Sequence, residues 1–426
     1  MIAAKILHEL RDDFFVSTAQ LRCLAAQFAS EMRAGLNGQP QSLAMLPSWL
    51  THPTGREKGL SLSLDFGGTN VRAMIVELDG HGRYTIRSHR SVPLTAPSGE
   101  YDYTGPGVTG EELFRFIAAL LGEVAPPAGQ LPLGHTFSFP CRQTAVNEAY
   151  LLYWTKEIAV SGMVGRNVTE LLRGALTGSG LHHIRPVVVV NDTVTTLLTA
   201  AYTDEHAHIG SICGTGHNSC YLEPSHPASP FPMYVNIEAG NFNQIPFNRF
   251  DELLDRASER PGAGRLEKVC SGRYMGELFR LTCLHLNTMG LDTSLLGGSL
   301  HSPYSLTSQD MSRWLNDSRT EAASLRTAAR LIAVRSARLA AATWTAILAH
   351  IDPGLTGPHT IAIDGSLYEK LPGYAGSIRD TLTELLGEKA DWVTCRLVKD
   401  GSGVGAAVAA AAVWNNGQFE HGYGDA

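Results

Sequence analysis

Two short segments of small and polar residues have the composition of turns that bind phosphate groups. In the first, DFGGTNVR, Gly67 and Gly68 carry no Cβ that would block an anion, and glycine permits the positive φ angles of a tight turn. Backbone N–H groups in such a turn form an anion-binding concavity, to which Thr69, Asn70 and Arg72 add donors and positive charge. A plain hairpin with polar residues in its turn explains these residues equally well.

A carboxylate and a second turn extend this pattern. Asp65 ends the apolar run before the first turn, where a carboxylate could hold Mg²⁺ through a water molecule. The second turn contains Gly214, Thr215 and Gly216 between two further apolar runs. By itself it is weak evidence, because many hairpins use such residues. Two such turns together favour a nucleoside triphosphate, whose several phosphates need several anion-binding turns.

An asparagine and an aspartate follow an unbroken run of valines, residues 187–190. Such a run is typical of a strand buried on both faces of a parallel sheet, and ligands gather at the carboxyl ends of parallel strands. Asp192 could there accept the proton of an attacking hydroxyl, since an ordinary aspartate is ionised at pH 7. The alternative, which these residues alone favour, is that Asp192 caps the helix that follows.

Two other segments are ambiguous. Lys156, in the segment WTK, could bind a phosphate or a sugar oxygen, although a lone lysine is usually an exposed surface residue. Residues 401–406, GSGVGA, satisfy the relaxed dinucleotide pattern G-x-G-x-x-G/A. The chain ends too soon after them, however, for the second strand and acidic residue that this pattern requires. A glycine turn at the start of a helix can still face a nucleotide.

Helices and strands must hold these residues in place, and the spacing of apolar residues predicts where they lie. Helical spacing occurs within residues 6–36, 111–124, 265–288 and 321–350. Strands are expected around the two turns, at 61–78 and 208–223, and at 186–190, 360–364 and 392–398. A glycine turn and an alanine-rich helix are expected after the last strand. Because a strand–turn–strand unit occurs twice, the sequence predicts a two-lobed α/β protein.

Length and composition exclude several classes of protein. The chain has 426 residues, which exceeds the size at which one hydrophobic core usually stops growing. Its 44% hydrophobic and 18% charged residues exclude a largely disordered or collagen-like chain. A net charge of −7 gives no overall attraction to nucleic acid or to an anionic membrane, so neither is expected as a partner.

Cysteine content and the apolar segments predict the compartment. Seven cysteines are sparse and odd in number, which fits a reducing environment, and Cys213 and Cys220 are expected to be buried small hydrophobes. The first residues, MIAAKILHEL, lack the features of a secretory signal. The apolar stretches look too short to cross a bilayer. We therefore expect a cytoplasmic protein.

The order of the motifs resembles that of the hexokinase family of the actin-like ATPase superfamily. The blocks that carry this resemblance are LDFGGTNVR (64–72), TFSFPCRQT (136–144), WTK (154–156), VVVVNDTV (187–194), GTGHNSCYLE (214–223), NIEAGNF (236–242), LEKVCSGRYMGEL (266–278), DGSLYEKLP (364–372) and DGSGVGAA (400–407). Together they span roughly residues 60–410. Each block alone is weakly specific, whereas the ordered set is highly specific.

The resemblance implies ATP-dependent phosphorylation of the 6-hydroxyl of glucose or a related hexose, with Mg²⁺ as cofactor. Asp192 would be the catalytic base, and Lys156 and Arg72 would stabilise charge on the transferring phosphoryl group. The sugar-contacting residues of the family match Ser138, Thr155, Lys156, Asn191, Asp192, Asn218, Glu238 and Glu267. Its nucleotide-binding residues match Asp65, Gly67, Gly68, Thr69, Asn70, Arg72, Gly214, Thr215, Gly216, Gly365, Ser366, Gly401, Ser402 and Gly403. No direct metal ligand is implied, and Asp65 would reach Mg²⁺ through water.

The resemblance also implies a two-lobed actin-like ATPase fold of the ribonuclease H-like type, with a central cleft that closes on the sugar. The small lobe would hold residues 61–188 and the C-terminal helix 402–415. The large lobe would hold residues 193–397 and the N-terminal helices 1–52, with hinges near 53–60, 189–192 and 397–402. A monomer or a homodimer is expected.

Several departures from the family pattern leave the preferred sugar open. Ala239 replaces a usual tryptophan, Leu266 replaces an aromatic residue, His217 replaces a frequent serine, and the segment between Phe242 and Leu266 is short. All border the expected sugar site, so a kinase for mannose, fructose or glucosamine is the first alternative. A sugar-sensing protein without turnover is the second, although the retained Asp192 argues against it. Anchoring to a mitochondrial surface through the N-terminus is weaker, because MIAAKILHEL runs into a charged helix.

Overall fold

The protein is described by a computed structural model that covers residues 2–155 and 158–417. Lys156, which the sequence places in the site, lies outside the described residues. The α-helices are α1 Ile2–Phe14, α2 Thr18–Leu36, α3 Gly110–Val124, α4 Val168–Gly178, α5 Asp192–Thr203, α6 Arg249–Ala257, α7 Arg265–Cys270, α8 Gly272–Thr288, α9 Ser308–Asn316, α10 Ala323–Ile351, α11 Ser366–Lys370, α12 Tyr374–Leu386 and α13 Gly401–Asn415. Short 3₁₀ helices are η1 Ala239–Asn241, η2 Ser294–His301 and η3 Gly387–Trp392.

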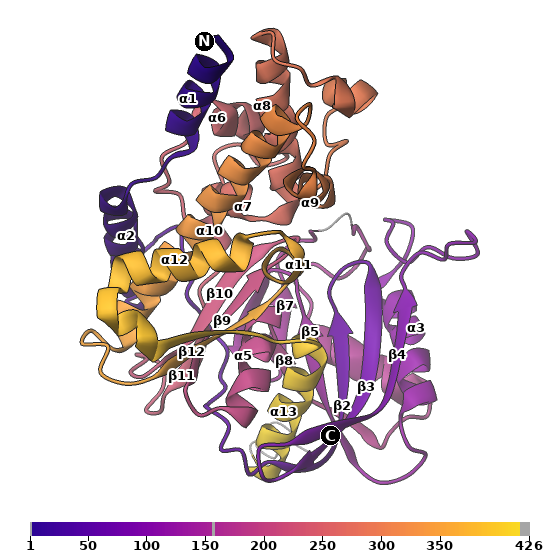
Figure 1. Cartoon of the computed structure of the whole chain (residues 1–426). Helices are drawn as coiled ribbons and strands as arrows, with labels where there is room; N and C mark the ends of the chain where they lie inside the picture. Colours follow the sequence, from indigo (N-terminus) through magenta and orange to yellow (C-terminus); the bar gives the residue numbers. More distant parts are fainter. Residues whose placement is uncertain (1, 156–157, 418–426) are drawn as a thin grey trace. The chain divides into compact units, whose positions relative to one another are not determined.

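The strands interleave with these helices along the chain (Figure 1). They are β1 Leu46–Pro47, β2 Lys58–Phe66, β3 Asn70–Asp79, β4 Tyr84–Pro93, β5 Leu131–Phe137, β6 Cys141–Ala145, β7 Glu148–Leu151, β8 Ile184–Val190, β9 Ala207–Cys213, β10 His217–Glu223, β11 Met233–Asn236, β12 His359–Asp364 and β13 Val393–Leu397. The helices and strands predicted from apolar spacing are confirmed. The glycine turn expected before the alanine-rich helix is wrong, because residues 401–406 already belong to α13.

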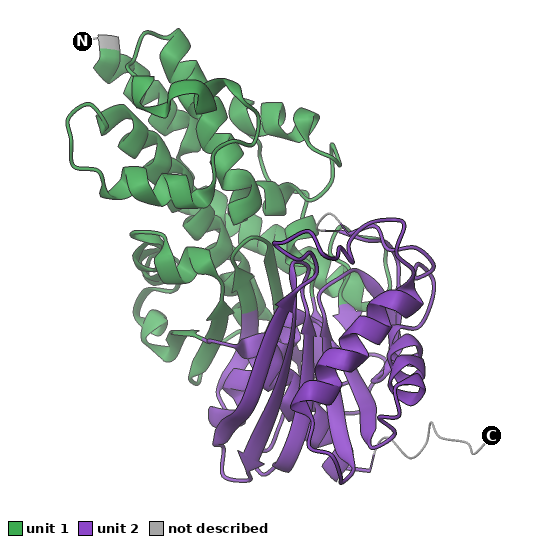
Figure 2. Ribbon diagram, turned by 90° about the vertical axis from the view of Figure 1, so that its right-hand side faces the viewer, with its two compact units in different colours: residues 1–45, 211–219, 237–397 green, residues 46–210, 220–236, 398–426 purple. Residues whose placement is uncertain are grey.

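The chain divides into two compact units, which Figure 2 shows in different colours. Unit 1 comprises Met1–Met45, Ser211–Ser219 and Ile237–Leu397, and unit 2 comprises Leu46–Gly210, Cys220–Asn236 and the chain from Val398. Residues 193–210 and 220–236, assigned from the sequence to the large lobe, therefore group with the segment assigned to the small lobe. The hinges and the closing cleft stay predictions.

Unit 2 contains a five-stranded sheet in the order β4-β3-β2-β5-β8, in which β2, β5 and β8 run parallel. Alternate side chains of β3 face opposite layers, as the pleat of a strand requires. Val71, Ala73 and Ile75 join a core with α3 and α4, whereas Met74 and Val76 pack with α13. The sheet is therefore held between helices on both faces.

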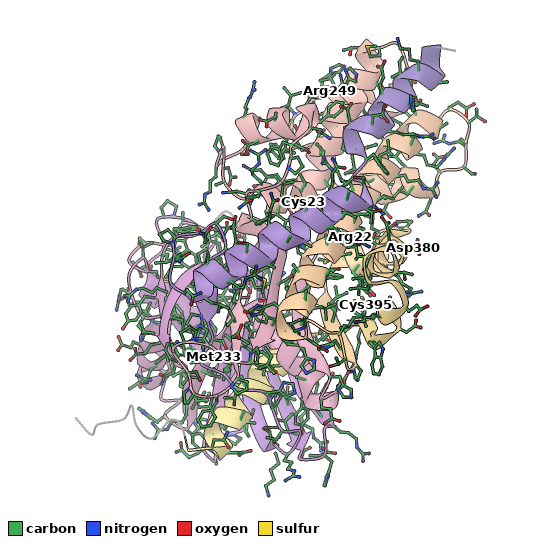
Figure 3. All side chains as sticks on the ribbon, turned by 90° about the vertical axis from the view of Figure 1, so that its left-hand side faces the viewer. Arg22, Cys23, Met233, Arg249, Asp380 and Cys395 are labelled. Atoms are coloured by element: carbon green, nitrogen blue, oxygen red, sulfur yellow. The ribbon has the colours of Figure 1, made fainter. Side chains whose placement is uncertain are left out.

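Unit 1 is mainly helical and is built around the long helix α10. A second sheet has six strands in the order β1-β11-β10-β9-β12-β13. Of this sheet, unit 1 contains β12, β13 and the turn between β9 and β10 with the adjoining strand ends. Trp344 of α10 is buried and lies 3.3 Å from the hydroxyls of Ser211 and Ser219. Helix α1 is tied to α6 by the Arg249–Asp13 ion pair; Figure 3 labels Arg249.

Helix α10 corrects one expectation about apolar stretches. By length and composition it is apolar enough to cross a membrane, so the stretches are not all too short. Its most apolar window is 78% buried within the protein, however, as in the core helix of a globular domain. Length and apolarity alone are therefore weak evidence for a membrane span.

The two cysteines that the sequence predicts to be buried are buried in the structure. In the described residues all seven are free thiols, of which Cys23 on α2 and Cys395 on β13 are labelled in Figure 3. Cys213 and Cys220 are buried, and burial raises the pKa of the Cys213 thiol to about 12. Both therefore act as small hydrophobic side chains that stay protonated at neutral pH.

Candidate functional site

Parallel pairing in unit 2 brings three of the expected site residues to one edge of the sheet. Asp65 of β2 pairs in register with Thr136 of β5, which in turn pairs with the last residue of β8. Ser138 and Asn191 directly follow β5 and β8, so both lie at the same carboxyl edge as Asp65. This is the edge at which ligands bind in open α/β sheets.

The first glycine turn joins β2 to β3 at this edge. Asp65 and Arg72 face each other across the two strands, with 3.5 Å between Asp65 Oδ2 and Arg72 Nη1. Gly68 has a φ of 137°, a conformation that residues with a side chain rarely adopt. A Cβ at Gly67 would lie 3.7 Å from Asp65 Oδ1 and 4.0 Å from the Ser138 hydroxyl. The turn expected to bind phosphate therefore lies beside Asp65, the carboxylate expected near the metal, and beside Ser138, which is expected to contact the sugar.

The structure decides which residue caps helix α5. Asn191, not Asp192, is the N-cap: its side-chain oxygen accepts the Thr193 N–H at 2.9 Å and the Thr193 hydroxyl at 2.6 Å. Asp192 occupies the first helical position, is half-buried, and accepts the Thr193 N–H through Oδ1 at 2.9 Å. The simple capping interpretation of Asp192 is therefore wrong, and its carboxylate keeps acceptor capacity for a ligand hydroxyl.

In unit 1, the second glycine turn contacts the start of α11. A Cβ at Gly214 would lie 3.3 Å from Gly365 Cα and 3.6 Å from the Ser366 nitrogen. Gly365 has a φ of 125°, and a Cβ there would collide with the Cys213 carbonyl oxygen. Only glycine fits this close approach. The structure thus brings together the two segments that the sequence assigned to the nucleotide.

The N-terminus of α8 holds the second turn from behind. The backbone N–H of Gly272 donates to the Gly214 carbonyl at 2.8 Å, and that of Arg273 donates to the Thr215 carbonyl at 3.1 Å. These bonds use N–H groups that a helix otherwise leaves without partners. These two hydrogen bonds fix the orientation of the Gly214 and Thr215 peptide groups in the absence of a ligand.

Three of the amino acids expected to contact the sugar form one cluster in unit 1. Asn218 accepts the Ala239 N–H at 3.0 Å and donates to Glu238 Oε1 at 3.5 Å. Glu267 Oε2 accepts the His217 N–H at 3.1 Å. Glu238 has a φ of 57°, which is unusual for a residue with a side chain and marks a conformation that the surrounding structure imposes. An amide and two carboxylates therefore meet in fixed orientations suited to sugar hydroxyls.

The departures from the family pattern are buried beside this cluster. Ala239 and Leu266 are fully buried, so each contributes to packing under the polar residues. His217 is also buried, and burial lowers its pKa to about 4, which keeps it neutral at pH 7. All three therefore pack against the amino acids expected to contact the sugar, and none of them adds a charge there.

The glycines of α13 have a packing role. A Cβ at Gly403 would lie 2.6 Å from Met74 Sδ, and one at Gly405 would collide with the Thr195 carbonyl oxygen. Gly401 and Gly403 are buried, and the Ser402 carbonyl accepts the Thr136 hydroxyl at 2.7 Å. These contacts explain the glycine pattern by close helix packing. A nucleotide contact at Gly401, Ser402 and Gly403 stays a prediction.

Residues that sequence reasoning missed support the site from below. Gly240 adjoins Glu267, and Lys268, next in sequence to Glu267, is buried in an ion pair. The only sequence signal was that both fall inside motif blocks.

Among residues 2–155 and 158–417, no cluster of three or more His, Cys, Asp or Glu is placed to hold a metal. Thr155 is half-buried and its carbonyl accepts the Ile158 N–H at 3.3 Å.

Comparison with known proteins agrees with this arrangement. Two family models described as hexokinase match residues 6–202 and 208–412. Hexokinase-7 of Oryza sativa subsp. japonica is 35% identical, over 96% of this chain and 97% of that protein. A solved structure described as a crystal structure of hexokinase has a TM-score of 0.85 at 32% identity, over 96% of this chain and 99% of that one. The hexokinase from Schistosoma mansoni complexed with glucose has a TM-score of 0.81 at 29% identity, with the same two coverages.

The likeness confirms the actin-like ATPase fold class that the sequence predicted. It extends along nearly all of the chain, so the motif blocks and the two glycine turns belong to one ordered pattern. The chain therefore belongs to the hexokinase family, and it is an enzyme that phosphorylates hexoses with ATP.

Proposed function

We propose that the enzyme transfers the γ-phosphoryl group of ATP to the 6-hydroxyl of glucose or a closely related hexose. The observation that carries this proposal is the position of Asp192 at the carboxyl edge of the sheet. Because Asn191 caps helix α5, the carboxylate of Asp192 can accept a hydrogen bond from the ligand. The hydroxyl proton passes to Asp192 as the sugar oxygen forms a bond to phosphorus. The bond from phosphorus to the bridging oxygen breaks, and ADP leaves.

The other residues bind and orient the reactants. Ser138, Asn191, Asn218, Glu238 and Glu267 donate to or accept from sugar hydroxyls, and the two glycine turns present backbone N–H groups to the phosphates. Arg72 and Lys156 offset negative charge on the transferring group. The glucose complex of the Schistosoma mansoni relative supports glucose as the reference substrate.

Mg²⁺ fits the described residues as a cofactor. Mg²⁺ keeps several waters and binds through one or two carboxylates and the substrate phosphates, so it needs no cluster of protein ligands. Asp65 is a single carboxylate beside the glycine turn, and no side chain at Gly67 covers it. Asp65 would therefore hold Mg²⁺ through water, and the ion would neutralise phosphate charge.

Several finer features belong to the same proposal. Entry of the sugar into glycolysis, a glucokinase-like preference, a cytoplasmic location and a monomeric or homodimeric state follow from the resemblance. Closure of a cleft on the sugar would limit transfer to water. The buried Ala239, Leu266 and His217 favour, as a second candidate, a preference for mannose, fructose or glucosamine.

The test is a coupled ADP-release assay with ATP, Mg²⁺ and a panel of hexoses, run on the wild type and on Asp192→Asn. Removing the base is expected to lower kcat by about 10²–10⁴-fold, with a smaller change in the KM for sugar. Asp204→Asn, at the other end of α5, is the matched control and should keep wild-type kinetics. Turnover in Asp192→Asn equal to that of the wild type would refute the role of Asp192 as the catalytic base. Glucose binding without turnover of any hexose would instead indicate a sugar sensor.

A further inference from the structure

Lys268 is a buried lysine directly after Glu267 in helix α7. Its side chain is only 3% exposed, whereas lysine is among the residues that are almost never fully buried unless paired. Burying an ammonium group is costly, and the cost is offset only by a partner and by complete hydrogen bonding. The position therefore needs an explanation in terms of what the ammonium holds.

The ammonium joins α7 to α6 and to the loop between them. It donates to Asp255 Oδ1 of α6 and, at 2.7 Å, to the carbonyl oxygen of Arg260 in the loop. Asp255 also accepts the Gly262 N–H, at 3.1 Å through Oδ1 and 3.0 Å through Oδ2. Burial works against the charged form of Asp255, but the bonds from Lys268 and Gly262 win and lower its pKa. One ion pair thus organises the loop that leads into α7.

Helix α7 depends on such anchors. It has six residues, and its N-cap is Gly264, which has no side chain to satisfy the helix terminus. So short a helix has little stability of its own. At the other side, the Leu266 N–H donates to the Phe242 carbonyl at 3.1 Å. The Lys268–Asp255 pair and this backbone bond lie on either side of Glu267 and are therefore among the contacts that fix the direction of its side chain.

We propose that Lys268 is a positioning residue for hexose binding. Its ion pair with Asp255 keeps α7 where Glu267 Oε2 meets the His217 N–H, so that the carboxylate is presented to the sugar in one orientation. Lys268 does not touch the substrate. The inference rests on the proposed sugar-binding role of Glu267.

A matched buried ion pair lies on the next helix. Arg280 Nη2 is 2.6 Å from Glu277 Oε1, and both side chains are nearly fully buried. This pair holds other groups, the Leu300 carbonyl and the Tyr304 N–H, rather than the loop before α7. Breaking it tests the effect of an unpaired buried charge in the same unit without disturbing Glu267.

The first experiment compares Lys268→Met with Arg280→Met in the full-length enzyme. Both are expected to lower Tm, because each leaves a buried carboxylate unpaired. Only Lys268→Met is expected to raise the KM for glucose, by about 10- to 100-fold, as a displacement of up to 1 Å would. The KM for ATP should change far less. Equal glucose KM values in a folded Lys268→Met and the wild type would overturn the proposal.

A double variant separates positioning from stability if Lys268→Met does not fold. Lys268→Met with Asp255→Leu removes both charges, so much of the lost Tm should return. The bonds to Arg260 and Gly262 remain lost, so the glucose KM should stay raised. A return of the KM with the Tm would show a merely structural lysine. Glu267→Gln is the reference: an unchanged glucose KM there refutes the role of Glu267 itself, not only that of Lys268.

Discussion

Replacing Gly240 with alanine is expected to disrupt hexose binding, because no room exists for a methyl group beside Glu267. A Cβ at Gly240 would lie 2.5 Å from Glu267 Oε2, 2.8 Å from the His217 carbonyl oxygen and 3.2 Å from Glu267 Cβ. Ordinary contacts begin at 3.4 Å, so the carboxylate oxygen must move by about 0.9 Å or the η1 turn must shift. Either movement displaces a sugar residue, since η1 directly follows Glu238.

The size of the effect follows from this displacement. A misplacement of about 1 Å can cost about 10²-fold, so kcat/KM for glucose should fall by that factor, or roughly 2.7 kcal/mol of transition-state stabilisation. Overpacking should also lower the free energy of unfolding by about 1–3 kcal/mol. The assay is coupled ADP release with glucose varied at saturating ATP, beside an equilibrium glucose titration by calorimetry.

Gly376→Ala is the matched control for Gly240→Ala. Gly376 lies within α12 of the same unit, and a Cβ there would meet no heavy atom within 4 Å. Alanine is the better helix former, so this variant should keep wild-type kinetics and a Tm that is equal or higher. If folded Gly240→Ala kept the wild-type kcat/KM for glucose, Glu267 would not bind the sugar from its observed position.

Two further predictions concern the nucleotide turn and the core of unit 2. Gly365→Ala should lower the free energy of unfolding by about 3 kcal/mol and raise the KM for ATP, because it adds strain at a φ of 125° and a clash with Cys213. Unchanged Tm and ATP KM would contradict the close approach of the two turns. His135 is fully buried with neither ring nitrogen hydrogen-bonded, and burial lowers its pKa to about 3 from the 6.5 of an exposed histidine. Its contribution to stability is complete above pH 6.5 and is lost as the pH falls from 6.5 towards 3, since only the unfolded chain takes up the proton. Between pH 7 and pH 5 the wild type should therefore lose about 2 kcal/mol more than His135→Leu, measured by urea unfolding. Identical losses in the two proteins would refute this assignment.

Local patterns in the sequence predicted the elements that carry a strong apolar period. The valine run before Asn191 was found because burial on both faces of a strand leaves a direct trace in composition. The two glycine turns were found from their small and polar residues. Strand β4 was missed because most of its residues are exposed, so it has no alternation of apolar and polar residues. Where the packing leaves no period, the sequence carries no signal.

The glycines of α13 show a pattern whose meaning depends on its surroundings. The pattern G-x-G-x-x-G/A is typical of dinucleotide-binding turns, but glycines also occur where a helix packs closely against its neighbours. The neighbours Met74 and Thr195, which are far away in the sequence, explain the buried Gly403 and Gly405. The assignment of the cap of α5 to Asn191 rather than Asp192 is of the same kind, because either residue type can cap a helix.

The sequence by itself determined the family, the order of the α/β elements and the identity of the residues expected to act, because these depend on residue type and local spacing. Tertiary structure alone decided how the residues are supported. Lys268 and Asp255, thirteen positions apart, form one buried pair, and Gly240 leaves space for Glu267. Such contacts join segments distant in sequence, and their energy comes from burial and exact fit, neither of which a single sequence displays.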